Sequence, residues 1–191
     1  MASENAYLYW CIFIKLTKEV SNQKTMTKLI NFFIGIVQHY NHQKYWKYRN
    51  YVQNHKGKIN LKLLWYVWYI KKTDAFHNAS TGITFGEGSA YFQSPPILPH
   101  GLNGIIIAQK TKIGTNVCIF QQVTIGNDFK KSENVPEIGN NVTIYPGAKI
   151  FGKIKIGDNV KIAPNAVVFF DVPSNSTVVA GNSYIKNKSP E

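Results

Sequence analysis

One histidine stands out among the residues that could do chemistry. Histidines occur at positions 39, 42, 55, 77 and 100, and only His100 lies inside or next to a regular six-residue repeat in the second half of the chain. An imidazole can take a proton from a hydroxyl group near neutral pH, as a general base does. His100 is therefore the candidate base. The plain alternative is a surface histidine in a turn flanked by proline.

The elements that must position this histidine follow from a spacing of six residues. The positions that obey it are Ile107, Ile113, Ile119, Ile125, Ile138, Ile144, Ile150, Ile156, Ile162 and Val168. Four residues after each stands a second position, which is apolar in nine of ten cases, with Phe129 among them and Thr111 as the exception. This period predicts a coil of short parallel strands with one large side chain per rung in a narrow core. Sharp corners, where positive φ is often needed, are expected at Asn116, Asn140, Asn141 and Asn159.

The repeat is irregular before residue 105 and is broken once. Phe85, Tyr91 and Ile97 also lie six residues apart, and we interpret them as the first rungs. The break at 127–136, NDFKKSENVP, is polar and charged. We expect it to leave the coil at a corner as a loop, and loops on rigid scaffolds often carry function.

Residues 1–80 have a different composition. They carry 12 Lys and Arg against three acids, and all four tryptophans. Apolar clusters at helical spacing predict helices over residues 4–20, 25–40, 43–53 and 61–72. Some aromatic residues are expected to pack the helices on the open end of the coil, covering unpaired strand edges. The predicted division is a basic helical region over 1–80, repeats over 81–185 with the loop 127–136, and a tail over 186–191.

Composition excludes several classes of protein. With 44% hydrophobic residues, the chain is neither disordered nor a collagen-like fibre. Cys11 and Cys118 are too few for a disulfide framework, which favours a reducing cytoplasm. The apolar runs are shorter than the roughly 20 residues that a membrane-spanning helix needs, and we recognise no secretory signal. A metal site is not expected, because His100 stands alone among the repeats.

The units of the form I-G-x-x-V-x, over roughly residues 80–185, resemble the hexapeptide-repeat family of acyltransferases. The resemblance implies a mainly β fold, a left-handed parallel β-helix with three hexapeptides per coil, preceded here by an α-helical region. It also implies acetyl-CoA as co-substrate. The segment 98–126, LPHGLNGIIIAQKTKIGTNVCIFQQVTIG, resembles serine acetyltransferases and, more closely, the O-acetyltransferases of capsule and exopolysaccharide clusters.

The resemblance assigns catalytic roles. His100 stands where the family's general base stands, in a site shared by two subunits. Serine acetyltransferases carry an Asp about one coil upstream of the base, whereas here Ala75 is aligned with it and Asp74 is displaced by one. Asp74 is the candidate for orienting His100, and Glu87 is another. A solvated surface position competes for both acids, and a backbone carbonyl could orient the imidazole equally well.

The resemblance also implies ligand contacts. Acetyl-CoA would lie in a groove between adjacent β-helices, at positions that are also ordinary corner residues: Gly126, Asn127, Tyr145, Pro146, Gly147, Ala148, Ala163 and Pro164. Lys186, Lys188, Lys149 and Lys161 could reach its phosphates, although solvated lysine is the commoner state. Acceptor contacts are assigned to Asn103, Gln121, Gln122 and Asp128. For the two glutamines, an amide ladder on the coil exterior is the alternative.

Two departures bear on the acceptor. Serine acetyltransferases carry an Asp directly before the base and an Arg-His-Pro in the loop, where this chain has Pro99 and the tripeptide 134–136, Asn-Val-Pro. A small zwitterion would lack its charged partners, which favours a hydroxyl of a sugar or polysaccharide. The expected function is therefore sugar or polysaccharide O-acetylation. The alternatives are a serine O-acetyltransferase and a non-catalytic hexapeptide scaffold or polyanion-binding protein.

Partners and location follow from the same resemblance and from charge. A homotrimer is implied, acting on a glycan that the formal net charge of +12 would allow to be acidic. The basic first half could also hold an anionic membrane face, so we expect the protein in the cytoplasm or peripherally at the inner face of the membrane. A nucleic-acid partner is not expected, because charge alone would support it.

Overall fold

The computed structural model describes residues 26, 27, 29, 30, 39–84 and 88–181 of the 191-residue chain. The chain divides into two compact units, Met1–Asn41 and His42–Glu191. In the first unit, residues 26, 27, 29 and 30 are helical, inside the span predicted as 25–40, whereas the helix predicted over 4–20 lies outside the described residues. The boundary between the units, at residue 41, differs from the domain boundary near residue 80 that the change in sequence composition predicts. The boundary near residue 80 stays a prediction.

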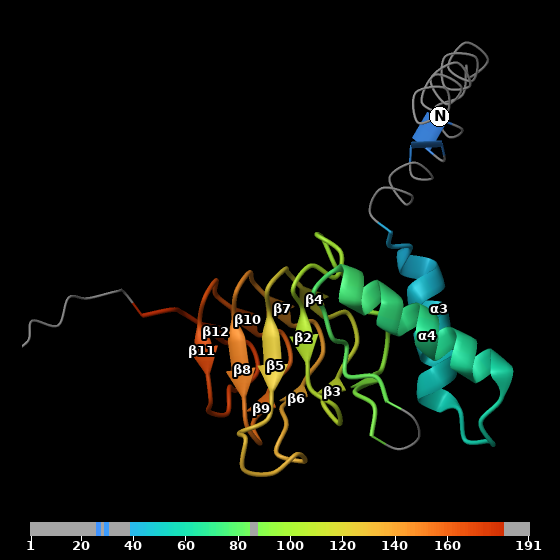
Figure 1. Cartoon of the computed structure of the whole chain (residues 1–191). Helices are drawn as coiled ribbons and strands as arrows, with labels where there is room; N and C mark the ends of the chain where they lie inside the picture. The colour runs from blue at the N-terminus through green and yellow to red at the C-terminus, as the bar shows by residue number, and fades with distance from the viewer. Residues whose placement is uncertain (1–25, 28, 31–38, 85–87, 182–191) are drawn as a thin grey trace, which may run out of the picture. The chain divides into compact units, whose positions relative to one another are not determined.

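Two helices open the second unit, α3 (His42–Asn54) and α4 (Leu61–Phe76). They confirm the helices predicted over 43–53 and 61–72, and α4 continues past the predicted end to Phe76. Asn60 starts α4, because its side-chain oxygen accepts a hydrogen bond from the backbone N–H of Leu63 at 2.8 Å. Figure 1 shows both helices at the end of the coil where the strands begin.

The described strands form three parallel sheets of four strands each. The first sheet contains β2 (Ile106–Ile107), β5 (Thr124–Gly126), β8 (Lys149–Phe151) and β11 (Val167–Val168). The second contains β1 (Tyr91–Phe92), β3 (Lys112–Ile113), β6 (Glu137–Ile138) and β9 (Lys155–Ile156). The third contains β4 (Cys118–Ile119), β7 (Thr143–Ile144), β10 (Lys161–Ile162) and β12 (Thr177–Val178).

The chain visits the three sheets in turn, so that successive coils stack on one another (Figure 1). Ile106 pairs with Thr124, 18 residues further on, as three hexapeptides per coil require. Lys112 pairs with Glu137, 25 residues further on, because that coil contains the loop 127–136. The predicted loop therefore leaves the coil at the corner between the first and second sheets.

Isoleucines stack along the inside of each sheet. In the third sheet, Ile119, Ile144 and Ile162 have no exposed surface, while the residue before each of them points outward. Burying one such side chain contributes roughly 1.5–3 kcal/mol, and each coil can bury its isoleucines only against the next coil. The six-residue spacing predicted this core directly.

Asparagines form the corner between the second and third sheets. Asn116, Asn141, Asn159 and Asn175 have φ between 53° and 61°, and each side-chain amide donates to the oxygen of the next at 2.9 to 3.1 Å. Asparagine tolerates this left-handed conformation better than other residues with a Cβ. The predicted positive φ is thus confirmed at Asn116, Asn141 and Asn159. Asn140 does not have a positive φ, and its side-chain oxygen accepts a hydrogen bond from the Thr115 backbone N–H at 2.8 Å.

Two predictions about the register are wrong. Tyr91 and Ile97 point outward, and Phe92 occupies the inward position opposite Ile113. The inward positions Phe92 and Leu98 are also six residues apart, and the longer corner that follows Leu98 separates them from the regular repeat, so a spacing of six did not distinguish the two sets. Phe85 lies outside the described residues. Phe129 is also not a core residue, because it lies exposed in the loop. The position of the repeat that was predicted for Phe129 is taken by residue 136, which is buried directly before β6.

Side chains of α3 close the edge of the first coil. Gln53 forms two hydrogen bonds with the backbone of Phe92, donating to its oxygen and accepting from its N–H, both at 3.0 Å. The fully buried Arg49 donates to the backbone oxygens of Thr81 at 2.6 Å and Ala90 at 3.0 Å. Burial lowers the pKa of Arg49 to about 10. The predicted covering of strand edges by the helical region is therefore seen at Phe92, although polar side chains do the pairing.

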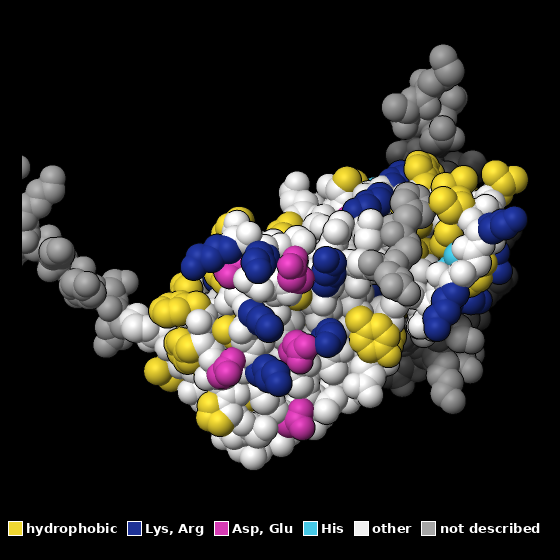
Figure 2. All heavy atoms as spheres, turned by 90° about the horizontal axis from the view of Figure 1, so that it is seen from below, with side chains coloured by type: hydrophobic (Ala, Val, Ile, Leu, Met, Phe, Trp, Pro, Cys, Tyr) yellow, Lys and Arg dark blue, Asp and Glu magenta, His cyan; other side chains and the backbone are white. Residues whose placement is uncertain are grey.

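The outward face of the second sheet is charged with both signs. Figure 2 shows lysines and acids interspersed over this face. Lys112 and Glu137 form an ion pair at 2.7 Å, with side chains 65% and 46% exposed. Such an exposed pair contributes less than about 1 kcal/mol, so this face gains solubility more than stability.

Candidate active site

His100 lies on an enlarged corner between the third and first sheets. The step from Leu98 to Ile107 is nine residues, whereas the equivalent step one coil later, from Ile119 to Ile125, is six. Leu102 has no exposed surface and anchors the enlarged corner to the core. The extra residues allow His100 to stand exposed on the surface.

The imidazole has an aromatic neighbour on the next coil. The ring centroids of His100 and Phe120 are 5.9 Å apart, and Phe120 stacks on Tyr145, one coil further, at 5.4 Å. Within the described residues, the one hydrogen bond of His100 is to its backbone oxygen, from the Asn103 side-chain amide at 2.9 Å. Both ring nitrogens are therefore open to a ligand from solvent.

Asp74 is taken up by a different set of contacts. It is 3% exposed, and it accepts hydrogen bonds from the Tyr45 hydroxyl at 2.5 Å and from the backbone N–H and the hydroxyl of Thr81, both at 3.3 Å. Burial raises the pKa of the Asp74 carboxyl, against the lowering effect of these hydrogen bonds. No hydrogen bond joins Asp74 to His100. In this chain, the carboxylate holds α3 and α4 to the segment that enters the first coil.

Asn103 and Gln122 share the surface beside His100. The backbone N–H of Gln122 donates to the backbone oxygen of Asn103 at 3.0 Å, which ties the enlarged corner to the corner below it. Both side chains are exposed. The Gln121 side-chain oxygen, in contrast, is buried and has no hydrogen-bond partner in the described part of the chain. Gln121 would have to turn to meet a ligand.

Most of the predicted acetyl-CoA contacts share this corner of the coil. Tyr145, Pro146, Gly147 and Ala148 follow β7, and Ala163 and Pro164 follow β10. Gly147 has a φ of 72°, and a Cβ there would clash with the side chain of Asn165, so glycine is needed for the turn itself. Lys149 and Lys161 lie on the sheets at either side of this corner, and the Lys149 ammonium donates to the Gln122 backbone oxygen at 2.8 Å.

Gly126, Asn127 and Asp128 lie at a different corner of the coil, at the carboxyl end of β5 in the first sheet. Since the width of that sheet separates the two corners, one chain does not bring these residues to its own His100. The Asp128 carboxylate accepts a hydrogen bond from the Asn134 side chain at 2.8 Å and two from backbone N–H groups of the loop. The hydrogen bond from Asn134 has the largest effect in lowering the pKa of Asp128, so this carboxylate stays negative.

Two candidates, Glu87 and Lys186, lie outside the described residues. Among the residues that the structure describes, no group of three or more His, Cys, Asp or Glu could hold a metal ion. No helix in the same residues is long and apolar enough to cross a membrane.

Sequence reasoning did not find the aromatic wall beside His100. Phe120 and Tyr145 each follow the last inward isoleucine of a strand in the third sheet. The signal that could have found them is an aromatic residue directly after Ile119 and Ile144, next in register to the candidate base. The wall offers an apolar surface to a ligand that approaches the imidazole.

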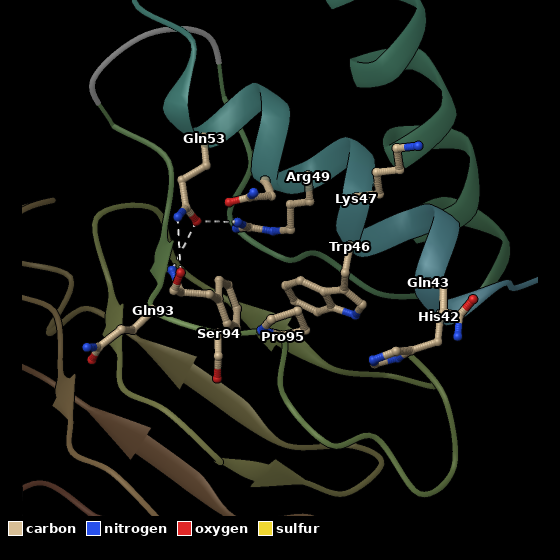
Figure 3. Close-up of a pocket in the computed structure, with 11 residues that line it drawn as sticks. His42, Gln43, Trp46, Lys47, Arg49, Gln53, Gln93, Ser94 and Pro95 are labelled. Atoms are coloured by element: carbon tan, nitrogen blue, oxygen red, sulfur yellow. Dashed lines mark hydrogen bonds between the residues drawn. The ribbon is translucent and has the colours of Figure 1, made fainter.

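A separate cleft of about 540 Å³ lies between α3 and the residues that follow β1 (Figure 3). Its lining includes Trp46 and Arg49 of α3 and Ser94 and Pro95 after β1. None of the site residues predicted from the sequence lines it. Figure 3 shows Arg49 and Gln53 turned toward the strand edge that they hold.

Part of the coil of hexapeptides is similar to a known family of repeats. Residues 136–169 match the family described as bacterial transferase hexapeptide (six repeats). A serine acetyltransferase of Staphylococcus aureus (strain Mu50) is 48% identical over 100 residues, which are 52% of this chain and 46% of that protein. The chain therefore spans about half the length of the relatives that it matches.

Solved structures agree with the fold. A serine acetyltransferase from Brucella abortus strain S19, in complex with coenzyme A, is 26% identical with a TM-score of 0.54, over 78% of this chain and 52% of that one. The Neisseria gonorrhoeae serine acetyltransferase in complex with serine is 28% identical with a TM-score of 0.52, over 62% and 46%. The predicted fold, a left-handed parallel β-helix with an N-terminal helical region, is confirmed.

The predicted sugar or polysaccharide acceptor is contradicted by these relatives, which are serine acetyltransferases. A closeness to capsule and exopolysaccharide enzymes is likewise not shown. The prediction relied on Pro99 and on the tripeptide at 134–136 in place of charged residues. Losing two charged partners does not exclude a zwitterion, because other charged groups of the site can replace them.

Proposed function

We propose that this chain transfers an acetyl group from acetyl-CoA to the hydroxyl of serine. The observation that carries the proposal is the 48% identity over 100 residues to a serine acetyltransferase. The exposed imidazole of His100, with both ring nitrogens open, supports the same chemistry. The solved relative that holds serine supports the acceptor, and the one that holds coenzyme A supports the donor.

His100 acts as the general base in this proposal. One ring nitrogen takes the hydroxyl proton while the serine oxygen attacks the thioester carbonyl carbon. The tetrahedral intermediate then breaks its C–S bond, and the imidazolium returns the proton to the departing sulfur. The products are O-acetylserine and coenzyme A. The exposed amide of Gln122, on the adjoining corner, is suited to donate to the oxyanion.

Charged groups of this chain suit a zwitterionic acceptor. Asp128 remains negative because its hydrogen bonds favour the carboxylate, which fits the ammonium group of serine. Lys149 is anchored to the Gln122 backbone oxygen near His100, which fits the serine carboxylate. These two residues take the place of the charged pair that serine acetyltransferases carry next to the base and in the loop.

The site requires more than one copy of the chain. His100 lies at the corner before the strands of the first sheet, and Asp128 lies at the corner after them. A second copy is therefore needed to bring a loop 127–136 to each histidine. A homotrimer with cyclic symmetry meets this need, since every corner then receives the loop of a neighbour. Hexapeptide-repeat acetyltransferases typically form trimers, which supports this arrangement.

Acetyl-CoA fits the corner that runs from His100 toward β10. Tyr145 and Phe120 offer aromatic surface along it, and Lys161 supplies positive charge at its side on the third sheet. The phosphates of coenzyme A are attracted to such a cation. The co-substrate supplies the activated acetyl group, and the corner holds it in line with the base.

The test is thiol release from acetyl-CoA by the full chain, with L-serine, L-threonine and no acceptor compared side by side. We expect turnover that requires L-serine, with O-acetylserine found by mass spectrometry. His100→Ala should lower kcat/KM by roughly 10²- to 10⁴-fold, the usual contribution of a general base. His55→Ala is the matched control, because His55 lies after α3 and bonds the Lys58 backbone oxygen.

The proposal fails if L-serine does not raise thiol release above the rate without acceptor. It also fails in its mechanism if His100→Ala keeps full activity while remaining folded by circular dichroism. Binding of coenzyme A without any turnover would favour the non-catalytic scaffold instead.

A further inference from the structure

Helix α4 has two apolar faces, and one of them is exposed. Leu63, Val67 and Ile70 on one face are buried. On the opposite side, Leu61, Leu64, Trp65 and Trp68 recur at helical spacing with exposed fractions of 85%, 43%, 56% and 50%. We call these four residues the α4 stripe. A surface helix normally carries polar residues on its outer face, so the exposed α4 stripe indicates a surface that binds a partner.

The two indoles of the α4 stripe form one flat surface. Trp65 and Trp68 stack with ring centroids 4.9 Å apart, and the Lys72 ammonium lies 5.1 Å from the Trp68 ring. Trp has an apolar body and one N–H donor, which suits the boundary between water and hydrocarbon. Lysines at the edge of such a surface can keep their charge in water while their stems cover apolar groups.

The charge around the α4 stripe has one sign. Residues 39–84 contain eight Lys and Arg and one acid, Asp74, which is buried. Lys58, Lys62, Lys71 and Lys72 lie on α4 or just before it. Figure 2 shows lysine and apolar side chains at the helical end of the molecule and no acidic side chain there in that view, unlike the face of the second sheet.

We propose that the α4 stripe and its lysines dock this protein on the surface of an anionic lipid bilayer. The apolar side chains would enter the headgroup region, and the lysines would pair with lipid phosphates. This inference goes beyond acetyl transfer and does not depend on it. It concerns the exposed face of α4, whose one predicted site residue, Asp74, is buried on the other side of the helix.

A second copy of the chain is a poorer occupant. Two α4 stripes facing each other would bring eight lysines together with no exposed acid between residues 39 and 84 to offset them, and like charges repel. A nucleic acid would use the lysines and leave exposed leucines uncovered, since its outer surface is charged phosphate. A bilayer with acidic headgroups satisfies both the charge and the apolar area.

The test is flotation of the full chain with vesicles of phosphatidylcholine alone or with phosphatidylglycerol added. We expect binding to the anionic vesicles only, weakening as NaCl rises from ~0.1 M to ~0.5 M. Lys71→Glu with Lys72→Glu should lower the partition coefficient by roughly 30-fold or more, from the usual contribution of each basic residue near a charged membrane. Lys110→Glu with Lys153→Glu is the control of equal net charge on the coil, and it should bind like the native chain.

The apolar part has its own readout. Anionic vesicles carrying brominated acyl chains should quench the tryptophan fluorescence of the native chain, and Trp65→Ser with Trp68→Ser should remove most of this quenching and lower partitioning by about tenfold or more. Both substitutions are at exposed positions, and circular dichroism checks that the fold is kept. Equal binding to both kinds of vesicle, or unchanged binding of either α4 variant, overturns the proposal. A change of sedimenting mass in the Trp variant with vesicle binding intact would assign the stripe to a second copy and also overturn it.

Discussion

Thr111 is the polar exception in an apolar column, and its replacement tests how this coil is held together. The residue has no exposed surface, and its hydroxyl oxygen is buried without a hydrogen-bond partner in the described residues. In register, its neighbours on the coils before and after are Ala90 and residue 136, a proline, which offer no side-chain hydrogen bond. Thr111→Val keeps the shape of the side chain and removes the unpaired group.

The expected gain follows from the environment. A buried polar group without a partner costs about 1–3 kcal/mol, and the added methyl group contributes further to burial. We therefore expect Thr111→Val to raise the free energy of unfolding by about 1–2 kcal/mol. For a chain of this size, that corresponds to a rise in Tm of roughly 2–8 °C.

Thr81→Val is the matched comparison. Its hydroxyl lies 2.7 Å from the Tyr45 hydroxyl and donates to Asp74 at 3.3 Å, and the residue is 1% exposed. The same substitution there should lower the free energy of unfolding by about 1–3 kcal/mol, because two buried partners lose a hydrogen bond. The assay is thermal unfolding followed by circular dichroism at one fixed protein concentration. A neutral or destabilising Thr111→Val would refute the reasoning, since it would mean that the hydroxyl has a partner.

Two further predictions concern the network and the corner. Because burial raises the pKa of Asp74, its folded-state pKa lies above that of the unfolded chain, so its contribution to stability is complete below the unfolded pKa and is lost as pH rises through the folded pKa. The stability of the native chain minus that of Asp74→Asn, measured by urea unfolding, should therefore fall as pH rises above the ordinary pKa of a carboxyl group, and a rise would contradict this. Turnover per folded molecule should stay near native, unlike that of His100→Ala. Gly147→Ala should lower Tm, since the residue has a φ of 72° and its new Cβ would press on Asn165, and an unchanged melting curve would show that the corner can relax.

The regular coils could be predicted because each rung repeats the same physical rule. An inward isoleucine every six residues needs no knowledge of distant contacts, so the core and the parallel strands followed from spacing alone. The first coil could not be predicted in register, because the corner from Leu98 to Ile107 is enlarged by a local turn. Phe129 misled for the same reason, since an inserted loop can mimic the period that it interrupts.

The candidate site was predictable only in part. His100 was found by elimination among five histidines, and the structure leaves its ring nitrogens open to solvent. The surroundings of Asp74 were out of reach, because its partner Tyr45 is 29 residues away in sequence and the pairing depends on how α3 and α4 pack. The acceptor was predicted wrongly, because two missing charges were weighed without the charged groups that could replace them.

Gln53 closes the edge of the solenoid at β1, the first strand of the coil. Its side-chain amide donates one hydrogen bond to the Phe92 backbone and accepts one from it, as a peptide group of a neighbouring strand would. Because a side chain cannot continue into a further residue, no strand extends from this pairing. A strand of another molecule that approached β1 would find the template already occupied at this point. A single glutamine of α3 thus blocks the addition of a further strand at β1. On this side, the number of coils is limited by α3 and not by the sequence of the repeats.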